Sequence, residues 1–260
     1  MGFYDLGKQK REKLVQKIER DILRALKTRQ MEILERYTSD SDTYIRKNAY
    51  LILGRLYRDH KDQRTKILET ASLLFQSNDE KIRQTSVYVL GEIGKVDGAK
   101  AIKLMAEALE DEHHSVRNAV IGALKQMGAK NPELVLDFAR RFLHHPDPKI
   151  RREVIHGIEL RGRTHPEEIL PLLKELENDP DRKIRDTVVH VIGQISYKEG
   201  CLEKVVSALK TWHNQELVDE ATAEILNVHK RYERFSAKPY KEAKQYVEDH
   251  LSIKKKTNEA

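Results

Sequence analysis

The feature that most constrains this chain is a short block of residues that recurs at nearly constant spacing, as in SDTYIRKNAYLILG and NDEKIRQTSVYVLG. Each copy is built around an apolar anchor residue, which an arginine follows in every copy but the last. The first two anchors lie 37 residues apart and all later neighbours lie 34 apart. Such a period indicates supersecondary units that stack on one another. The anchors are Ile45, Ile82, Val116, Ile150, Ile184 and Val218.

Each block has the pattern of one amphipathic helix. In most blocks apolar residues stand four and eight positions after the anchor, as Ala49 and Leu53 do after Ile45, and this spacing puts them on one helical face. A second segment of helical period, such as KILETASLLFQ, precedes the later blocks, and turn formers such as HHPDP separate the two. The sequence therefore predicts an all-α fold, a right-handed α-solenoid (superhelix) of about six helical hairpins that share one continuous core.

Two further helices are expected at the ends of the repeat array. Residues 8–27 combine an apolar face with eight basic residues, and residues 239–251 form a helical segment that opens at Pro239. Both fit solvated caps, and contact of the first helix, or of Lys254, Lys255 and Lys256, with phosphate is the alternative. The expected division is a basic N-terminal cap helix (1–28), the repeats (29–234), and a C-terminal cap helix with a basic tail (235–260).

The charge balance favours acidic partners without choosing among them. Lys and Arg number 48 against 42 Asp and Glu, a formal net charge of +6, which suits nucleic acid or an acidic protein surface. The single cysteine, Cys201, cannot form an intramolecular disulfide, and neither a signal peptide nor a long apolar run stands out. We therefore expect a cytoplasmic protein with no membrane contact.

An acidic residue recurs in the turn three residues before the anchor, where its side chain can cap the first N–H groups of the second helix. An aspartate in this turn, followed by Ile-Arg or Val-Arg, resembles the signature of HEAT repeats, and the resemblance covers roughly residues 29–234. These aspartates are Asp42, Asp79, Asp147 and Asp181.

The arginine that follows each anchor forms a ladder along the repeats. The resemblance implies that it pairs with turn aspartates of its own or of a neighbouring repeat, and charges held inside a stack are normally paired. We therefore interpret the ladder as structural, with nucleic-acid contact as the alternative. Its members are Arg46, Arg83, Arg117, Arg151 and Arg185.

Second helices line the inner, concave face in HEAT proteins, so the resemblance implies a row of side chains along that face. The row is basic to neutral, with histidines near its centre, and could hold a nucleic-acid backbone by charge and shape. A groove for a large protein partner would use the same residues. The candidate binding residues are Lys47, Arg55, Tyr88, Lys125, Arg152, His156, Arg161, Arg163 and His190.

Residues 144–198 also resemble the bacterial alkylpurine DNA glycosylases built on HEAT-like repeats. The shared positions include the His-Pro-Asp turn and the ILPLL segment, residues 169–173. Where that family has its catalytic carboxylates, this chain has His156 and Gln194, which cannot supply the anion that an oxocarbenium-like sugar needs. Glu153 and Glu159 are the nearby carboxylates that could replace it.

The prediction is a non-catalytic HEAT-repeat scaffold whose basic concave face binds nucleic acid or a nucleic-acid-associated complex. A protein–protein adaptor is the first alternative and a DNA glycosylase acting on alkylated purines is the second. We expect no catalytic residues, no cofactor and no metal, because the histidine doublets at 113–114 and 144–145 lie in turns and at different offsets from their anchors.

Overall fold

The computed structural model describes residues 2–251, and the three tail lysines, Lys254 to Lys256, lie outside them. The described chain contains helices and turns but no strand, which confirms the all-α prediction. It divides into two compact units, Met1–Phe138 and Ala139–Ala260, with the boundary inside helix α8 (Pro132–Phe142).

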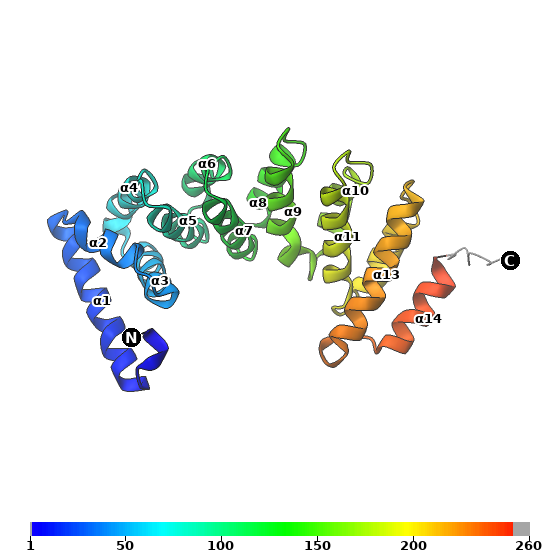
Figure 1. Cartoon of the computed structure of the whole chain (residues 1–260), viewed down its shortest axis with the longest axis horizontal. Helices are drawn as coiled ribbons and strands as arrows, with labels where there is room; N and C mark the ends of the chain where they lie inside the picture. Colours follow the sequence, from blue (N-terminus) through cyan, green and yellow to red (C-terminus); the bar gives the residue numbers. More distant parts are fainter. Residues whose placement is uncertain (1, 252–260) are drawn as a thin grey trace. The chain divides into compact units, whose positions relative to one another are not determined.

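The first and second helices of the repeat alternate regularly along the chain in both units (Figure 1). Three short 3-10 helices, Phe3–Asp5, Lys61–Gln63 and Glu233–Phe235, supplement them. Unit 1 contains α1 (Lys8–Thr28), α2 (Met31–Thr38), α3 (Thr43–Asp59), α4 (Arg64–Phe75), α5 (Glu80–Gly94), α6 (Gly98–Leu109) and α7 (His114–Gly128). Unit 2 contains α9 (Pro148–Gly162), α10 (Pro166–Lys174), α11 (Arg182–Ser196), α12 (Cys201–Leu209), α13 (Gln215–Arg231) and α14 (Tyr240–His250).

In unit 1 the second helices α3, α5 and α7 form one layer, and the first helices α4 and α6 pack against it from one side (Figure 1). The residues predicted to share the apolar face lie in this interior. Ile67 of α4, Leu90 of α5, Met105 of α6 and Leu124 of α7 are fully buried. Burying each such side chain contributes roughly 1.5–3 kcal/mol, so the shared core of neighbouring hairpins is what stabilises helices this short.

Unit 2 repeats the arrangement with α9, α11 and α13 as its layer of second helices and α10 and α12 packed on them. Val154, Ile192, Val206 and Ile225 are its fully buried counterparts. The helix expected over residues 239–251 is α14, which packs on α12 and α13 through Ala243 and Val247.

A glycine nine residues after several anchors lets the second helices approach closely. A Cβ added at Gly91 of α5 would lie 2.9 Å from the Cα of Ala123 in α7, nearer than side-chain atoms approach a backbone. A Cβ added at Gly193 of α11 would lie 2.6 Å from Cγ of Glu224 in α13. The recurrence of glycine in the sequence thus reflects the spacing between helices of adjacent repeats.

Helix α1 packs on α2, α3 and α4 along one face. Ile18, Ile22, Ala25 and Leu26 are buried on this face, as the apolar periodicity predicts. The helix ends at Arg29, whose φ of 58° is left-handed and closes the last turn by donating its N–H to Ala25 O. The remaining face of α1 carries polar and basic side chains.

None of the helices within residues 2–251 combines the length and the apolar character that crossing a membrane requires.

Candidate functional site

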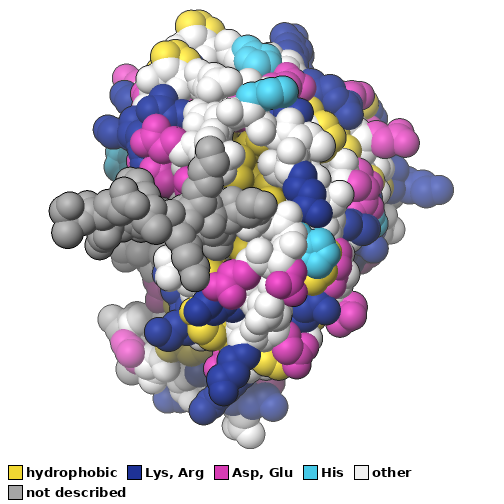
Figure 2. Space-filling model, turned by 90° about the vertical axis from the view of Figure 1, so that its right-hand side faces the viewer, with side chains coloured by type: hydrophobic (Ala, Val, Ile, Leu, Met, Phe, Trp, Pro, Cys, Tyr) yellow, Lys and Arg dark blue, Asp and Glu magenta, His cyan; other side chains and the backbone are white. Residues whose placement is uncertain are grey.

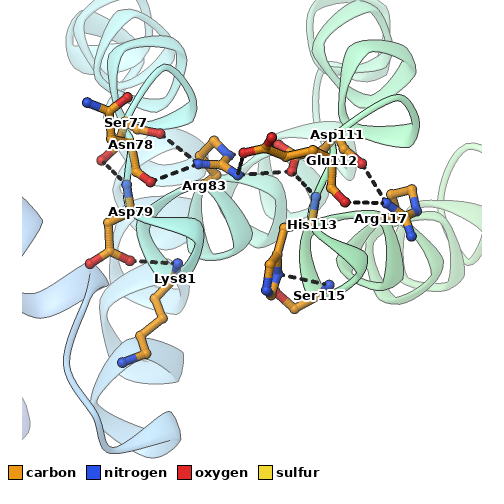
Figure 3. Close-up of polar contacts among 10 residues, drawn as sticks. All are labelled: Ser77, Asn78, Asp79, Lys81, Arg83, Asp111, Glu112, His113, Ser115 and Arg117. Carbon is orange, nitrogen blue, oxygen red and sulfur yellow. Dashed lines mark hydrogen bonds and ion pairs between the residues drawn. The ribbon is translucent and has the colours of Figure 1, made fainter.

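Side chains and carbonyl groups of the turn before each second helix hydrogen-bond to one another and to the start of that helix, as Figure 3 shows for α5 and α7. At the start of α5, the Asp79 carboxylate accepts the N–H of Lys81 at 2.7 Å. Two residues before this N-cap, Ser77 Oγ accepts the N–H of Asp79 at 3.2 Å, and the Ser77 carbonyl accepts Nη1 of Arg83 at 3.0 Å. The ladder arginine therefore binds a carbonyl of the turn between the two helices of its own repeat.

The same arrangement recurs in the other repeats. Asp42, Asp147 and Asp181 cap α3, α9 and α11 through side-chain bonds to the N–H two residues later. Each ladder arginine donates to the carbonyl six residues before it, and the pairs are Arg46 with Asp40, Arg117 with Asp111, Arg151 with His145 and Arg185 with Asp179.

Two ladder arginines also reach the next repeat, where they meet carboxylates that differ from the N-cap aspartates. Arg83 donates to both carboxylate oxygens of Asp111, at 2.8 and 3.1 Å, as Figure 3 shows. Arg151 Nη2 lies 2.8 Å from Asp179 Oδ1. Asp111 and Asp179 each stand two residues before the N-cap position of their own turn. Two members of the arginine ladder therefore join successive hairpins through carboxylates, whereas the other three donate to backbone carbonyls of their own turns.

The candidate binding residues of unit 1 have different surroundings from one another. Lys47 is exposed on α3, whereas Nη2 of Arg55 lies 2.7 Å from Glu19 Oε1 of α1. The Tyr88 ring stacks on that of Tyr50, with 5.1 Å between centroids, and burial raises the pKa of Tyr50 to about 12. Lys125 is half-buried on α7. Tyr88 thus lies packed between repeats, and Lys47 is the most open cation of this set.

In unit 2 the candidate arginines of α9 are matched with carboxylates. Arg161 donates to both oxygens of Glu168, at 2.8 and 2.7 Å, which raises the pKa of Arg161. Arg163 Nη2 donates to Glu159 Oε1 at 2.6 Å. Arg152, about half exposed, lies 3.6 Å from the buried Glu153. A count of basic residues in the sequence overstates the positive charge of these side chains, because glutamates lie beside them in the folded protein.

His156 and His190, the two candidate histidines, meet across α9 and α11. Their ring centroids are 5.7 Å apart in an edge-to-face arrangement. His156 Nδ1 lies 3.7 Å from Oε2 of Glu159, one turn further along α9. Arg163, which holds the other oxygen of Glu159, also donates to Gln194 Oε1 at 3.0 Å. The row predicted from the sequence therefore contains a polar cluster with a buried carboxylate at its centre.

Glu153 and Glu159, the carboxylates that could replace the glycosylase anion, are both buried, with relative exposures of 5%. Each lies beside an arginine, Arg152 at 3.6 Å and Arg163 at 2.6 Å. A carboxylate neutralised by a neighbouring guanidinium offers a developing sugar cation less stabilisation than an unpaired one.

A basic stripe runs along the exposed face of α1. Its members are three or four residues apart, so they stay on one side of the helix, opposite the buried apolar face. All six are exposed, and within residues 2–251 only Arg24 lies within ion-pairing distance of a carboxylate, 3.6 Å from Asp21. The stripe consists of Lys10, Lys13, Lys17, Arg20, Arg24 and Lys27.

The stripe contrasts with the C-terminal end of the molecule. Figure 2 faces that end and shows Lys and Arg side chains interspersed with Asp and Glu, without a gathering of one sign. Within unit 2, Arg182 illustrates the pattern, since it lies 2.7 Å from Asp186 and within hydrogen-bonding distance of Glu220. Uncompensated positive charge is thus concentrated on α1 among the surfaces described above.

Comparison with known families agrees with the repeat architecture. The family model for HEAT repeats matches residues 67–144 and 135–227. The chain belongs to the HEAT-repeat proteins, as the turn aspartates and ladder arginines indicate. No curated protein sequence matches it significantly.

Two solved structures from Streptococcus mutans share the fold. The structure of AlkD2 aligns with a TM-score of 0.57 at 19% sequence identity, covering 75% of this chain and 97% of that one. The structure of smu.31 from strain UA159 aligns with a TM-score of 0.51 at 18% identity, covering 78% and 97%. At these identities the likeness concerns the fold alone.

Proposed function

We propose that this chain is a non-catalytic HEAT-repeat scaffold that binds nucleic acid through the phosphate backbone. The observation that carries the proposal is the basic stripe on α1. Lys10 and Lys27, its ends, are 17 residues apart, which corresponds to about 26 Å of helix. One cation per roughly 5 Å suits a linear polyanion such as a nucleic-acid strand, whose phosphates carry uniform charge.

Two features favour nucleic acid over a membrane surface. A membrane-bound amphipathic helix inserts its apolar face between lipids. In α1 that face is already buried, because Ile18, Ile22 and Leu26 pack inside unit 1. The stripe itself is purely basic, so it can make charge contacts with phosphates while the helix stays in the fold.

The candidate binding residues of the predicted inner face contribute less to binding in this proposal than α1 does. Arg55, Arg161 and Arg163 are held by carboxylates, so they offer less charge to phosphate than the sequence suggests. Lys47 is an exposed member that remains, and Arg152, about half exposed, lies at the longer distance of 3.6 Å from its carboxylate. We propose that they add to binding and that α1 supplies most of the electrostatic attraction.

The test measures binding of labelled duplex DNA, single-stranded DNA and RNA by fluorescence anisotropy over a range of salt concentrations. Each phosphate neutralised on a duplex contributes about −0.9 to the slope of log K against log salt. Replacing Lys13, Lys17 and Arg20 together by Gln should make the slope less steep by about 2 to 3 and weaken binding at every salt concentration. The variant K47Q/R152Q should have a smaller effect.

A matched control removes the same amount of charge elsewhere. Lys81, Lys130 and Lys210 are exposed and scattered, so K81Q/K130Q/K210Q lowers the net charge equally without touching the stripe. If the two triple variants lost the same affinity for nucleic acid, net charge alone would explain the loss, and the proposal would be contradicted. Release of methylated purines from alkylated DNA by the wild-type protein would contradict the non-catalytic part.

A protein adaptor is the second candidate, and the neutralised inner face of unit 2 favours it. Arginines and carboxylates that are already paired, as Arg161 is with Glu168 and Arg163 is with Glu159, suit a partner with mixed charges better than a polyanion. Absence of nucleic-acid binding at low salt, together with unchanged folding, would favour this candidate.

A further inference from the structure

His156, Glu159 and His190 bring three potential metal-ligand atoms to one place in unit 2. The ring nitrogens of the histidines and a carboxylate oxygen of Glu159 all lie within 4.8 Å of one another. His156 and His190 are 34 residues apart, one repeat period, so the sequence contains no short metal-binding spacing that would reveal the cluster. It arises because the same position of α9 and α11 comes into register when the hairpins stack.

The helices hold these side chains with little freedom. His156 and Glu159 are three residues apart on α9, so they project from the same side of that helix. His190 projects from α11, which packs directly on α9. Glu159 is buried, whereas both histidines are partly exposed. The cluster is thus fixed on its inner side and open to solvent on its outer side.

Arg163 orients the carboxylate of Glu159. Its Nη2 donates to Oε1 at 2.6 Å, while Oε2 of the same carboxylate lies 3.7 Å from His156 Nδ1. Gln194 holds the arginine in turn, accepting from Nη2 at 3.0 Å. Ligating carboxylates in metal sites are commonly fixed by such hydrogen bonds, which leave one oxygen directed at the ion. Arg163 can therefore keep its bond to Oε1 while Oε2 faces the two imidazoles.

We propose that His156, Glu159 and His190 bind a zinc ion that links the second helices of two adjacent repeats. Two imidazole nitrogens and one carboxylate oxygen form a ligand set that zinc uses with tetrahedral geometry. Zinc–ligand bonds of about 2.0–2.1 Å place ligand atoms roughly 3.3 Å apart, so the ligand atoms need to approach one another by at most about 1.5 Å, within the reach of small side-chain rotations. The fourth position faces solvent and takes water.

The test measures zinc binding to the tag-free, full-length protein after treatment with a chelator. Isothermal titration should give one zinc ion per chain, and cobalt as a spectroscopic substitute should show the visible absorption of a tetrahedral site. The variants H156A, H190A and E159Q should each weaken zinc binding at least about tenfold, because each removes one of three protein ligands. Zinc should also raise the melting temperature of the wild-type protein but of none of these three variants.

His144 provides the matched control. It lies in the same unit and its Nε2 is 2.8 Å from Oε2 of Glu175, an exposed histidine–glutamate pair. H144A should bind zinc as the wild-type protein does. Circular dichroism in the presence of chelator shows whether each variant is folded, and E159Q preserves the shape of the side chain if the histidine variants are not. No stoichiometric zinc binding, or binding that E159Q and H190A leave unchanged, would overturn the proposal.

Discussion

Arg151 and Asp179 are each about nine-tenths buried, and their side chains meet at 2.8 Å between α9 and the turn before α11. Asp179 also accepts the N–H of Asp181, which caps α11. A buried ion pair adds little when compared with well-packed apolar residues, but removal of one partner leaves an uncompensated buried charge. The stability that is lost when one partner of an ion pair is removed therefore depends more on how deeply the pair is buried than on the distance between the two groups.

We expect Asp179→Ala to lower the free energy of unfolding by about 3–5 kcal/mol, because Arg151 would keep its charge in a buried place without its carboxylate. Urea denaturation followed by circular dichroism measures the loss. Asp186→Ala removes a carboxylate that lies 2.7 Å from Arg182 on the surface of α11, and it should change stability little. Similar losses in the two variants would show that the buried pair has no special importance.

His229 is fully buried on α13, and its Nδ1 lies 2.8 Å from Ser236 Oγ. Burial lowers the pKa of His229 below its ordinary value of 6.5, since the charged form is the one that desolvation disfavours. The unfolded chain therefore takes up this proton at a higher pH than the folded protein does. Stability is unaffected by this group above about pH 6.5 and falls as the pH drops below that value.

The corresponding experiment compares unfolding of the wild-type protein and His229→Gln at about pH 7.5 and pH 5.5. The wild-type protein should lose more stability on acidification than the variant, which has no proton to gain at this position. Carboxylates such as Glu177, whose pKa is lowered by hydrogen bonds from His213 and Asn214 despite the opposing effect of burial, contribute only at lower pH, below about 4.5. If the wild-type protein and His229→Gln lost the same stability on acidification, groups other than His229 would be responsible for the acid sensitivity.

At the scale of elements, the distance between second helices depends on glycine. Gly91 of α5 lies against the backbone of Ala123 in α7, and Gly54 of α3 lies against the side chain of Glu92 in α5, beginning with its Cβ. A flexible side chain can move aside, but a helix backbone moves only if the two helices separate. The close contact at Gly91 is therefore one that a substitution should disturb.

Gly91→Ala should lower the free energy of unfolding by roughly 1–3 kcal/mol, the range for overpacked sites, although alanine favours helix in isolation. Thermal and urea unfolding give the measurement. Gly128→Ala is the control, because a Cβ there meets only a Val135 methyl group at 3.8 Å, an ordinary contact. Destabilisation by the control but not by Gly91→Ala would contradict this account of helix spacing.

At the scale of the whole molecule, helical hairpins contact mainly their sequence neighbours. In unit 1, α5 packs mainly on α3, α4, α6 and α7, whereas α1 packs mainly on α2 and α3. Stability in such an architecture is close to a sum of hairpin terms and interface terms. Damage to one hairpin should therefore be felt locally before it is felt by the entire chain.

Val120 of α7 is fully buried and provides the test. Val120→Ala should increase amide hydrogen exchange most in α7 and its neighbours α5 and α6, and least in α1. Hydrogen exchange with mass spectrometry resolves these segments. A uniform increase over all helices would show that the chain unfolds as one cooperative unit.

The sequence by itself determined the repeat, its helices and most of their caps. Asp79 caps α5, and Gly91 lies where α5 and α7 approach closely. Both roles could be predicted because the residue types recur at the same position of several repeats. A basic N-terminal helix was likewise predictable from residues 8–27, since its two faces follow from helical spacing alone.

The tertiary structure decided which charges are available and which side chains meet. Arg161 and Arg163 look like free cations in the sequence, but their carboxylates lie beside them only after folding. Asp111 reaches Arg83, and His190 reaches His156, because stacking brings residues one repeat apart into contact. Periodicity specifies that hairpins stack, whereas the pairing of individual side chains depends on distances of a few ångströms that only the packed helices define.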